Sequence, residues 1–114
     1  RYLGHWNREE LCKNLTNYTN LILTSELELH PLVCLEALSA GLGLVVSSVA
    51  HQNLDLTMPF ITVVDQSLIK NSEAVSSAIL KNIEICNNLD RRKIRQYAEN
   101  FSWKNIANRY ISYL

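Results

Sequence analysis

The chain has 114 residues, of which 47% are hydrophobic and 19% charged, and eleven acidic residues balance eleven lysines and arginines. This composition is typical of one compact soluble domain and gives no sign of a nucleic-acid surface, because the basic residues are dispersed apart from an expected solvated helix face at 91–95. No apolar run approaches the roughly 18 residues that span a bilayer, and no signal-peptide pattern is present, so we expect a cytoplasmic protein.

The hydrophobic pattern predicts strands that alternate with helices. Strands are expected at residues 1–4, 20–24, 44–48 and 60–64. Helices are expected at residues 8–18, 31–42, 72–87, 90–100 and 103–113. This alternation predicts a single α/β domain with a Rossmann-like parallel sheet and flanking helices. Because four strands make a narrow sheet, its open edge is expected to pair with strands outside this chain.

Residues 25–41 are the most informative segment, since they place two carboxylates around a helix start. Pro31 suits the first position of a helix, which leaves Glu28 in the preceding loop and puts Glu36 inside the helix. Glu36 is expected to lie on an apolar, small-residue face, and no Lys or Arg occurs between Lys13 and Lys70 to pair with it locally. A ligand hydroxyl group is one candidate partner for this carboxylate.

Two other interpretations of Glu36 stay open: its side chain reaches solvent past Ala40, or it pairs with a distant arginine. The surrounding order of strand, loop, helix and strand favours a ligand, because α/β folds bind ligands at the carboxyl ends of their strands. The start of the helix also offers free N–H groups and a positive dipole end to phosphate.

The run Ser-x-x-Glu-x-x-Pro-Leu-Val-x-Leu-Glu-Ala-x-x-Ala-Gly at residues 25–41, followed by a Val-Val strand, resembles the Glu-x7-Glu signature of retaining GT-B glycosyltransferases of the glycosyltransferase 4 type. Residues 2–5 (Tyr-Leu-Gly-His) resemble a strand and loop of the family's donor domain. Residues 101–107 (Phe-Ser-Trp-Lys-Asn-Ile-Ala) resemble its closing helix. The resemblance covers nearly the whole chain and implies that residues 1–114 are one partial, C-terminal, nucleotide-sugar-binding domain.

The resemblance implies a role for each matching position. Glu36 would hydrogen-bond the ribose hydroxyls of a nucleotide-sugar donor, and Glu28 would act at the transferred sugar, beside the positive charge that develops at its anomeric carbon. The remaining implied donor-binding residues are the loop and helix start, His30, Pro31, Leu32 and Val33, and the segment that would hold the base, Gly4, His5 and Trp6. Packing is an equally open role for Trp6, and local capping or packing for His30.

The implied activity is transfer of a sugar from a UDP- or GDP-linked donor to an acceptor hydroxyl with retention, as in surface polysaccharide or glycoconjugate biosynthesis. A complete GT-B enzyme has a second domain that binds the acceptor, a glycan or lipid-linked glycan, so this chain is expected to be a fragment that is inactive alone. The resemblance implies no metal or other cofactor. It is compatible with a cytoplasmic enzyme at the inner face of the membrane.

Departures from the family pattern support alternatives. Residues 29–31 (Leu-His-Pro) stand where relatives often carry Gly-Phe-Gly, and residues 48–55 lack a Gly-Gly pair. A non-catalytic nucleotide- or protein-binding module on the same scaffold is therefore a second hypothesis. A GT-B sugar-nucleotide epimerase or a phosphorylase is a third.

The remaining patterns are expected to be structural. The three cysteines, Cys12, Cys34 and Cys86, have no metal-ligand spacing and are expected to be small core or helix residues in a reducing compartment. The histidines show no such spacing either. In the last helix, Trp103, Ile106, Tyr110 and Tyr113 form a stripe that is interpreted as core packing, although in the family the corresponding helices help to join the two domains.

Overall fold

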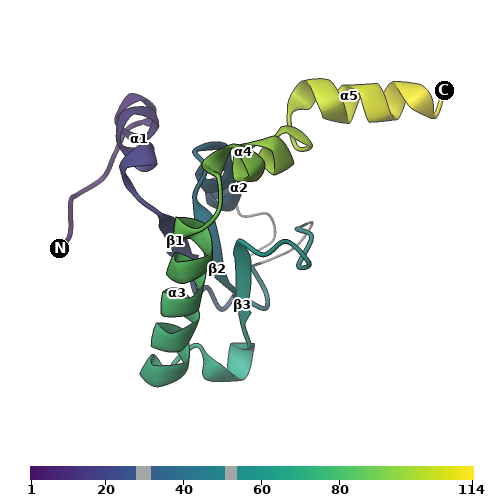
Figure 1. The fold of residues 1–114 in the computed structure, drawn as a ribbon. Coiled ribbons are helices and arrows are strands. Elements are labelled where there is room, and N and C mark those ends of the chain that lie inside the picture. The colour runs from purple at the N-terminus through teal and green to yellow at the C-terminus, as the bar shows by residue number, and fades with distance from the viewer. Residues whose placement is uncertain (28–31, 51–53) are drawn as a thin grey trace.

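The computed structural model describes residues 1–27, 32–50 and 54–114 (Figure 1). Within these residues the strands are β1 (Asn20–Leu23), β2 (Gly43–Ser47) and β3 (Ile61–Val64). The helices are α1 (Arg8–Asn14), α2 (Leu32–Ser39), α3 (Ser72–Asn87), α4 (Arg91–Glu99) and α5 (Trp103–Ser112). Short 3₁₀ turns follow α1 at Leu15–Asn17 and β3 at Gln66–Leu68.

The three strands form one parallel sheet in the order β1-β2-β3, with Leu21 opposite Leu44 and Leu44 opposite Ile61. Parallel neighbours joined by a crossover helix are the expected result of alternating strands and helices. The prediction of an α/β fold with a parallel sheet and flanking helices is confirmed.

The predicted strand at residues 1–4 is wrong. This segment pairs with no described strand, 91% of Tyr2 and 48% of Leu3 are exposed, and Gly4 adopts a φ of 84°. A strand is stable only when its backbone groups pair with a neighbouring strand, and the ladder of β1 in the described residues runs to β2 alone. The sheet therefore has three described strands where the sequence predicted four.

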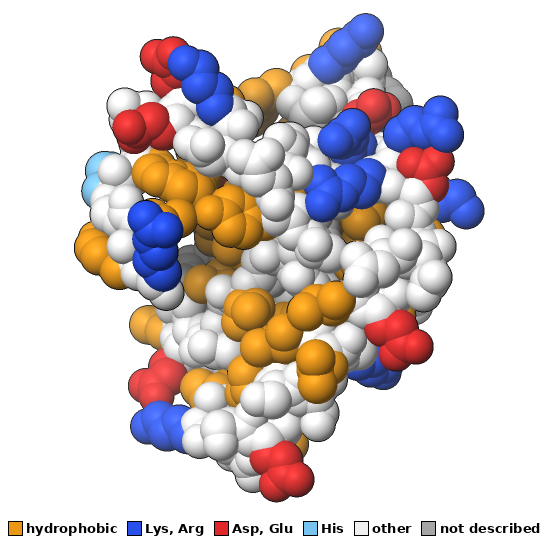
Figure 2. Space-filling view, turned by 60° about the vertical axis from the view of Figure 1, so that its left-hand side comes forward, with side chains coloured by type: hydrophobic (Ala, Val, Ile, Leu, Met, Phe, Trp, Pro, Cys, Tyr) orange, Lys and Arg blue, Asp and Glu red, His pale blue; other side chains and the backbone are white. Residues whose placement is uncertain are grey.

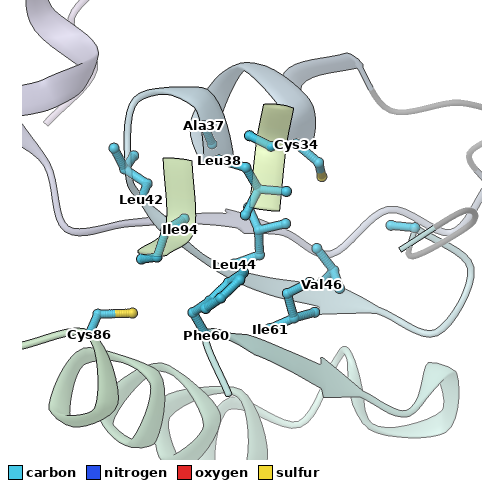
Figure 3. Packing of buried hydrophobic residues seen from close by; sticks show 12 residues of the cluster. Cys34, Ala37, Leu38, Leu42, Leu44, Val46, Phe60, Ile61, Cys86 and Ile94 are labelled. Carbon is cyan, nitrogen blue, oxygen red and sulfur yellow. The ribbon is translucent and has the colours of Figure 1, made fainter. Parts of the chain in front are cut away.

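The core lies mainly between the sheet and a pair of helices on one of its faces. Figure 3 shows α2 above the sheet, with α3 below it. Leu44 and Val46 point from β2 into the same cluster as Leu38 of α2 and Ile94 of α4. Because helices cover both faces of the sheet, all five residues of β2 are buried. Burial of each large side chain in this core contributes about 1.5–3 kcal/mol to the stability of the fold.

The end of α2 explains how the chain turns back into β2. Leu42 N–H donates to Ala37 C=O and Gly41 N–H donates to Leu38 C=O, both at 2.9 Å, with Gly41 at a φ of 82°. This is a Schellman motif, in which glycine takes the left-handed position after the helix. Helix α2 therefore ends at Ser39, three residues before the predicted boundary.

On the other face of the sheet, Asn82 of α3 is fully buried and holds the amino ends of the strands together. Its Oδ1 accepts a hydrogen bond from Asn20 Nδ2 at 2.9 Å. Its Nδ2 lies 2.9 Å from Leu44 O, 3.0 Å from Phe60 O and 3.0 Å from Thr62 Oγ1. The sequence alone does not reveal this role of Asn82, because nothing in the local pattern separates it from an exposed helix asparagine.

Gly43 permits α3 to lie this close to the sheet. A Cβ at this position would fall 2.3 Å from Cys86 Sγ and 2.6 Å from Asn82 Oδ1. Cys86 itself is 7% exposed, and burial raises the pKa of its thiol. Cys34 is also in the core and Cys12 lies on α1, so the prediction of core or helix cysteines is confirmed.

Helix α4 is amphipathic and joins α2 to the segment that precedes β1. Its apolar residues Ile94 and Ala98 are buried in the core. The solvated-face prediction is wrong for Arg91, which is half-buried, and its guanidinium donates to Thr16 O at 2.8 Å and Tyr18 O at 2.6 Å. Two backbone carbonyls outside the ladder of β1 thus gain a charged donor.

Helix α5 projects away from the rest of the molecule (Figure 1). Trp103, Tyr110 and Tyr113 are 85%, 73% and 87% exposed, and no residue of α5 is buried. The interpretation of this stripe as core packing is therefore wrong for the described chain.

Among the residues that the structure describes, no helix is long and apolar enough to cross a membrane.

Candidate functional site

The candidate site lies at the carboxyl edge of the sheet, where β1 leads towards α2. This is the edge at which α/β proteins bind ligands, because loops diverge there and helices begin there. The predicted catalytic Glu28 and the predicted donor-binding His30 and Pro31 lie outside the described residues. The described part of the site consists of residues 24–27, the first turns of α2 and the segments that follow β2 and β3.

The first turn of α2 presents Leu32, which is 61% exposed, and Val33, which is half-buried. The buried residues Cys34, Ala37 and Leu38 lie on the face of the helix opposite Leu32. The burial of these three side chains holds α2 in one rotation about its axis. The predicted donor residues Leu32 and Val33 therefore stand at the start of a helix whose orientation is set by the core.

Glu36 is exposed, and the expectation that its carboxylate lies on an apolar face is wrong. At 100° per residue, Glu36 lies roughly 150° around α2 from the centre of the buried face. Since its side chain is solvated, burial creates no need for a partner. The interpretation in which Glu36 reaches solvent describes this structure, and in that position the carboxylate is accessible to a dissolved ligand.

The ends of the three strands are joined by side chains beyond the regular ladder. Ser47, the last residue of β2, donates from Oγ to the carbonyl of Ser25 at 2.6 Å. Ser48 Oγ accepts from Gln66 N at 2.9 Å. The sequence shows two serines after the Val-Val pair, but it does not show which loops they hold. The partner of Ser47 lies 22 residues away and the partner of Ser48 lies 18 residues away.

Charged groups at this edge are solvated. Lys70 Nζ lies 3.2 Å from Glu26 Oε1, with both side chains largely exposed, so this ion pair adds little stability. Asp65 follows β3, and hydrogen bonds from the Ser67 hydroxyl and amide lower the pKa of its carboxyl group. Within the described ranges, no three acidic, histidine or cysteine side chains are grouped as metal ligands.

Gly4, His5 and Trp6 lie elsewhere. Trp6 packs against Tyr18, with ring centroids 6.2 Å apart, and His5 is exposed. Figure 2 shows a hollow bordered by hydrophobic side chains, and one hollow of about 340 Å³ has Gly4, Trp6, Tyr18 and Leu21 among its lining residues. This hollow adjoins the start of β1, so the structure does not bring these three residues to the carboxyl edge with Glu36.

No protein-family model, curated protein or solved structure matches the chain. The features that indicate a function are the motif of residues 25–41 and the positions of its described members.

Proposed function

We propose that the chain is the donor-binding part of a retaining glycosyltransferase of the GT-B type, which transfers a sugar from a nucleoside diphosphate sugar to an acceptor hydroxyl. One observation carries the proposal. The glutamate motif at residues 25–41 begins just after the carboxyl end of β1 and includes the first helix after it, and Glu36 is exposed on that helix. An exposed carboxylate beside the edge at which α/β sheets bind ligands supports a donor site.

In this proposal, Glu36 accepts hydrogen bonds from the two ribose hydroxyls, since a carboxylate has enough lone pairs to accept both. Amides of the first turn of α2, at Leu32 and Val33, face the diphosphate, which the positive end of the helix dipole attracts. Glu28 acts at the sugar, where its negative charge stabilises the positive charge that develops at the anomeric carbon. The leaving diphosphate assists the acceptor hydroxyl on the same face of the sugar, which gives retention.

A nucleotide titration tests the proposal. UDP, GDP and their sugars are titrated into the chain by ligand-observed NMR, up to about 1 mM, where even weak sites give saturable signals. The variant Glu36→Ala is expected to weaken binding about tenfold, because hydrogen bonds to a charged acceptor contribute about 1.5–3 kcal/mol.

Glu84→Ala is the matched control. Glu84 is also an exposed helix glutamate, but it lies on α3, the helix on the opposite face of the sheet, so its removal leaves affinity unchanged. Absence of binding by the folded wild-type chain contradicts the proposal. Binding that Glu36→Ala leaves untouched places the nucleotide elsewhere and equally contradicts it.

A further inference from the structure

The charges of the chain are separated along its sequence. Residues 90–114 include six basic and two acidic residues, whereas residues 1–89 include five basic and nine acidic residues. The chain is therefore neutral as a whole, yet the segment that contains α4 and α5 is cationic. Such a separation steers a molecule so that its cationic part meets partners of negative charge.

Helix α5, in the second half of this cationic segment, is amphipathic. At 100° per residue, its apolar side chains fall within an arc of about 140°. We call this arc the apolar face of α5, and it consists of Trp103, Ile106, Ala107, Tyr110 and Ile111. Lys104 lies at one edge of the apolar face and Arg109 near the other. The side opposite the apolar face carries only uncharged polar residues, Asn105, Asn108 and Ser112.

The polar side of α5 contacts the end of α4. Asn105 Nδ2 donates to the carbonyl of Glu99, and Arg109 Nη2 donates to the carbonyl of Asn100, both at 2.6 Å. Most of the apolar face is exposed, including 64% of Ile111. A helix that packs on the core of its own domain has the reverse arrangement, with its apolar side covered and its polar side in solvent.

The chemistry of the apolar face matches a membrane surface. Trp and Tyr are enriched where proteins meet the headgroup layer, because their rings are apolar and their N–H and O–H groups stay hydrated. Lys and Arg at the edges of such a face reach the lipid phosphates while their alkyl stems cover apolar surface. Lysine is, in contrast, depleted in protein–protein interfaces.

We propose that the apolar face of α5 docks on an anionic lipid surface, with the helix in the plane of the headgroups and with Lys104 and Arg109 at the level of the lipid phosphates. The aromatic side chains enter the headgroup layer, and the net positive charge of residues 90–114 attracts the negative surface. This docking does not depend on the proposed donor site.

Co-sedimentation with vesicles tests the proposal. The wild-type chain is mixed with vesicles of phosphatidylcholine alone, or of phosphatidylcholine and phosphatidylserine in equal amounts, up to about 1 mM lipid, where association constants of about 10⁴ M⁻¹ give saturable binding. Binding to the mixed vesicles is expected to be at least about tenfold tighter than to phosphatidylcholine, because each Lys or Arg near the surface adds attraction. Added salt is expected to reduce this preference.

Variants of α5 test whether this face makes the contact. Tyr110→Gln with Ile111→Gln is expected to weaken binding to the mixed vesicles at least about tenfold, because apolar area is lost from the contact. Lys104→Gln is expected to weaken it about fivefold. Leu80→Gln with Lys81→Gln is the matched control, since it removes an exposed apolar and an exposed basic side chain from α3, and it leaves binding unchanged.

Tryptophan fluorescence reports on the contact directly. In Trp6→Phe, Trp103 is the remaining tryptophan of the chain, and its emission is expected to shift to shorter wavelength on the mixed vesicles as its ring leaves water. If Trp6→Phe does not fold, Trp103→Phe replaces it, and this variant is expected to lose the shift that the wild-type chain shows.

Three results would overturn the inference. The first is a folded wild-type chain that shows no preference for the mixed vesicles. The second is binding by the folded Tyr110→Gln, Ile111→Gln variant that equals wild-type binding. The third is a wild-type dimer, detected by sedimentation velocity, that this double variant abolishes while vesicles bind neither protein, because the apolar face would then belong to a contact between two copies.

Discussion

Replacing Asn82 tests whether the amide network, rather than packing alone, holds α3 on the sheet. Asn82→Ala removes two amide protons that donate to strand oxygens and one acceptor for Asn20. At about 1 kcal/mol per net hydrogen bond, the free energy of unfolding falls by about 3 kcal/mol, and the space left by the amide adds to this loss. Since whole domains are stable by only about 5–15 kcal/mol, the effect is large.

The assay is urea unfolding followed by circular dichroism, with linear extrapolation to water. Asn82→Leu fills the space with an apolar group but leaves the buried polar partners without the amide, so it is expected to be destabilised by about 2–3 kcal/mol as well. Asn87→Ala, at an exposed position of the same helix, is expected to stay within about 0.5 kcal/mol of wild type. Wild-type stability of Asn82→Leu would refute the reasoning, because packing alone would then explain the position.

Two further predictions concern the end of α2 and the exposed face of α5. Gly41→Ala is expected to lower the free energy of unfolding by about 1–2 kcal/mol in the same assay, because a side chain at a φ of 82° is strained and its Cβ would lie 3.2 Å from Arg91 Cβ. Gly4→Ala is the control, because Gly4 has a similar φ of 84° but a Cβ there would meet nothing within 4 Å. Equal losses of stability in both variants would exclude a role for the Arg91 contact. The double variant Tyr110→Gln with Ile111→Gln is expected to change the free energy of unfolding by less than about 0.5 kcal/mol, because both side chains are exposed on α5. A loss above about 1 kcal/mol would show that α5 packs on the domain.

The helices illustrate how far local sequence signals reach. The predicted helix at 72–87 is observed with the same bounds, and those at 90–100 and 103–113 differ by one residue at one or both ends. Side chains of Asn71, Asp90 and Ser102 cap α3, α4 and α5, so the information that starts each helix lies within a few residues of its start. The shortened α2 ends at a glycine motif that the sequence also contains.

The misassigned residues depend on partners far along the chain. Residues 1–4 have the composition of a strand but no neighbouring strand among the described residues. The stripe on α5 has the spacing of a core helix, yet none of its residues is buried in this structure. A hydrophobic pattern shows that a surface is suited to burial, whereas burial itself requires a second surface that the pattern cannot locate.

The sequence by itself determined the α/β class, the order of helices and strands from residue 8 onwards, and a glutamate motif that covers the segment after β1 and the helix that follows. Those features follow from periodicity, capping residues and spacing, which act over short stretches of chain. Only the tertiary structure decided that Glu36 faces solvent, that Asn82 joins three strands and that Ser47 holds the loop after β1. Each of these depends on which side of an element is covered and on which distant atom supplies a hydrogen bond, and both are set by how elements far apart in the sequence come together.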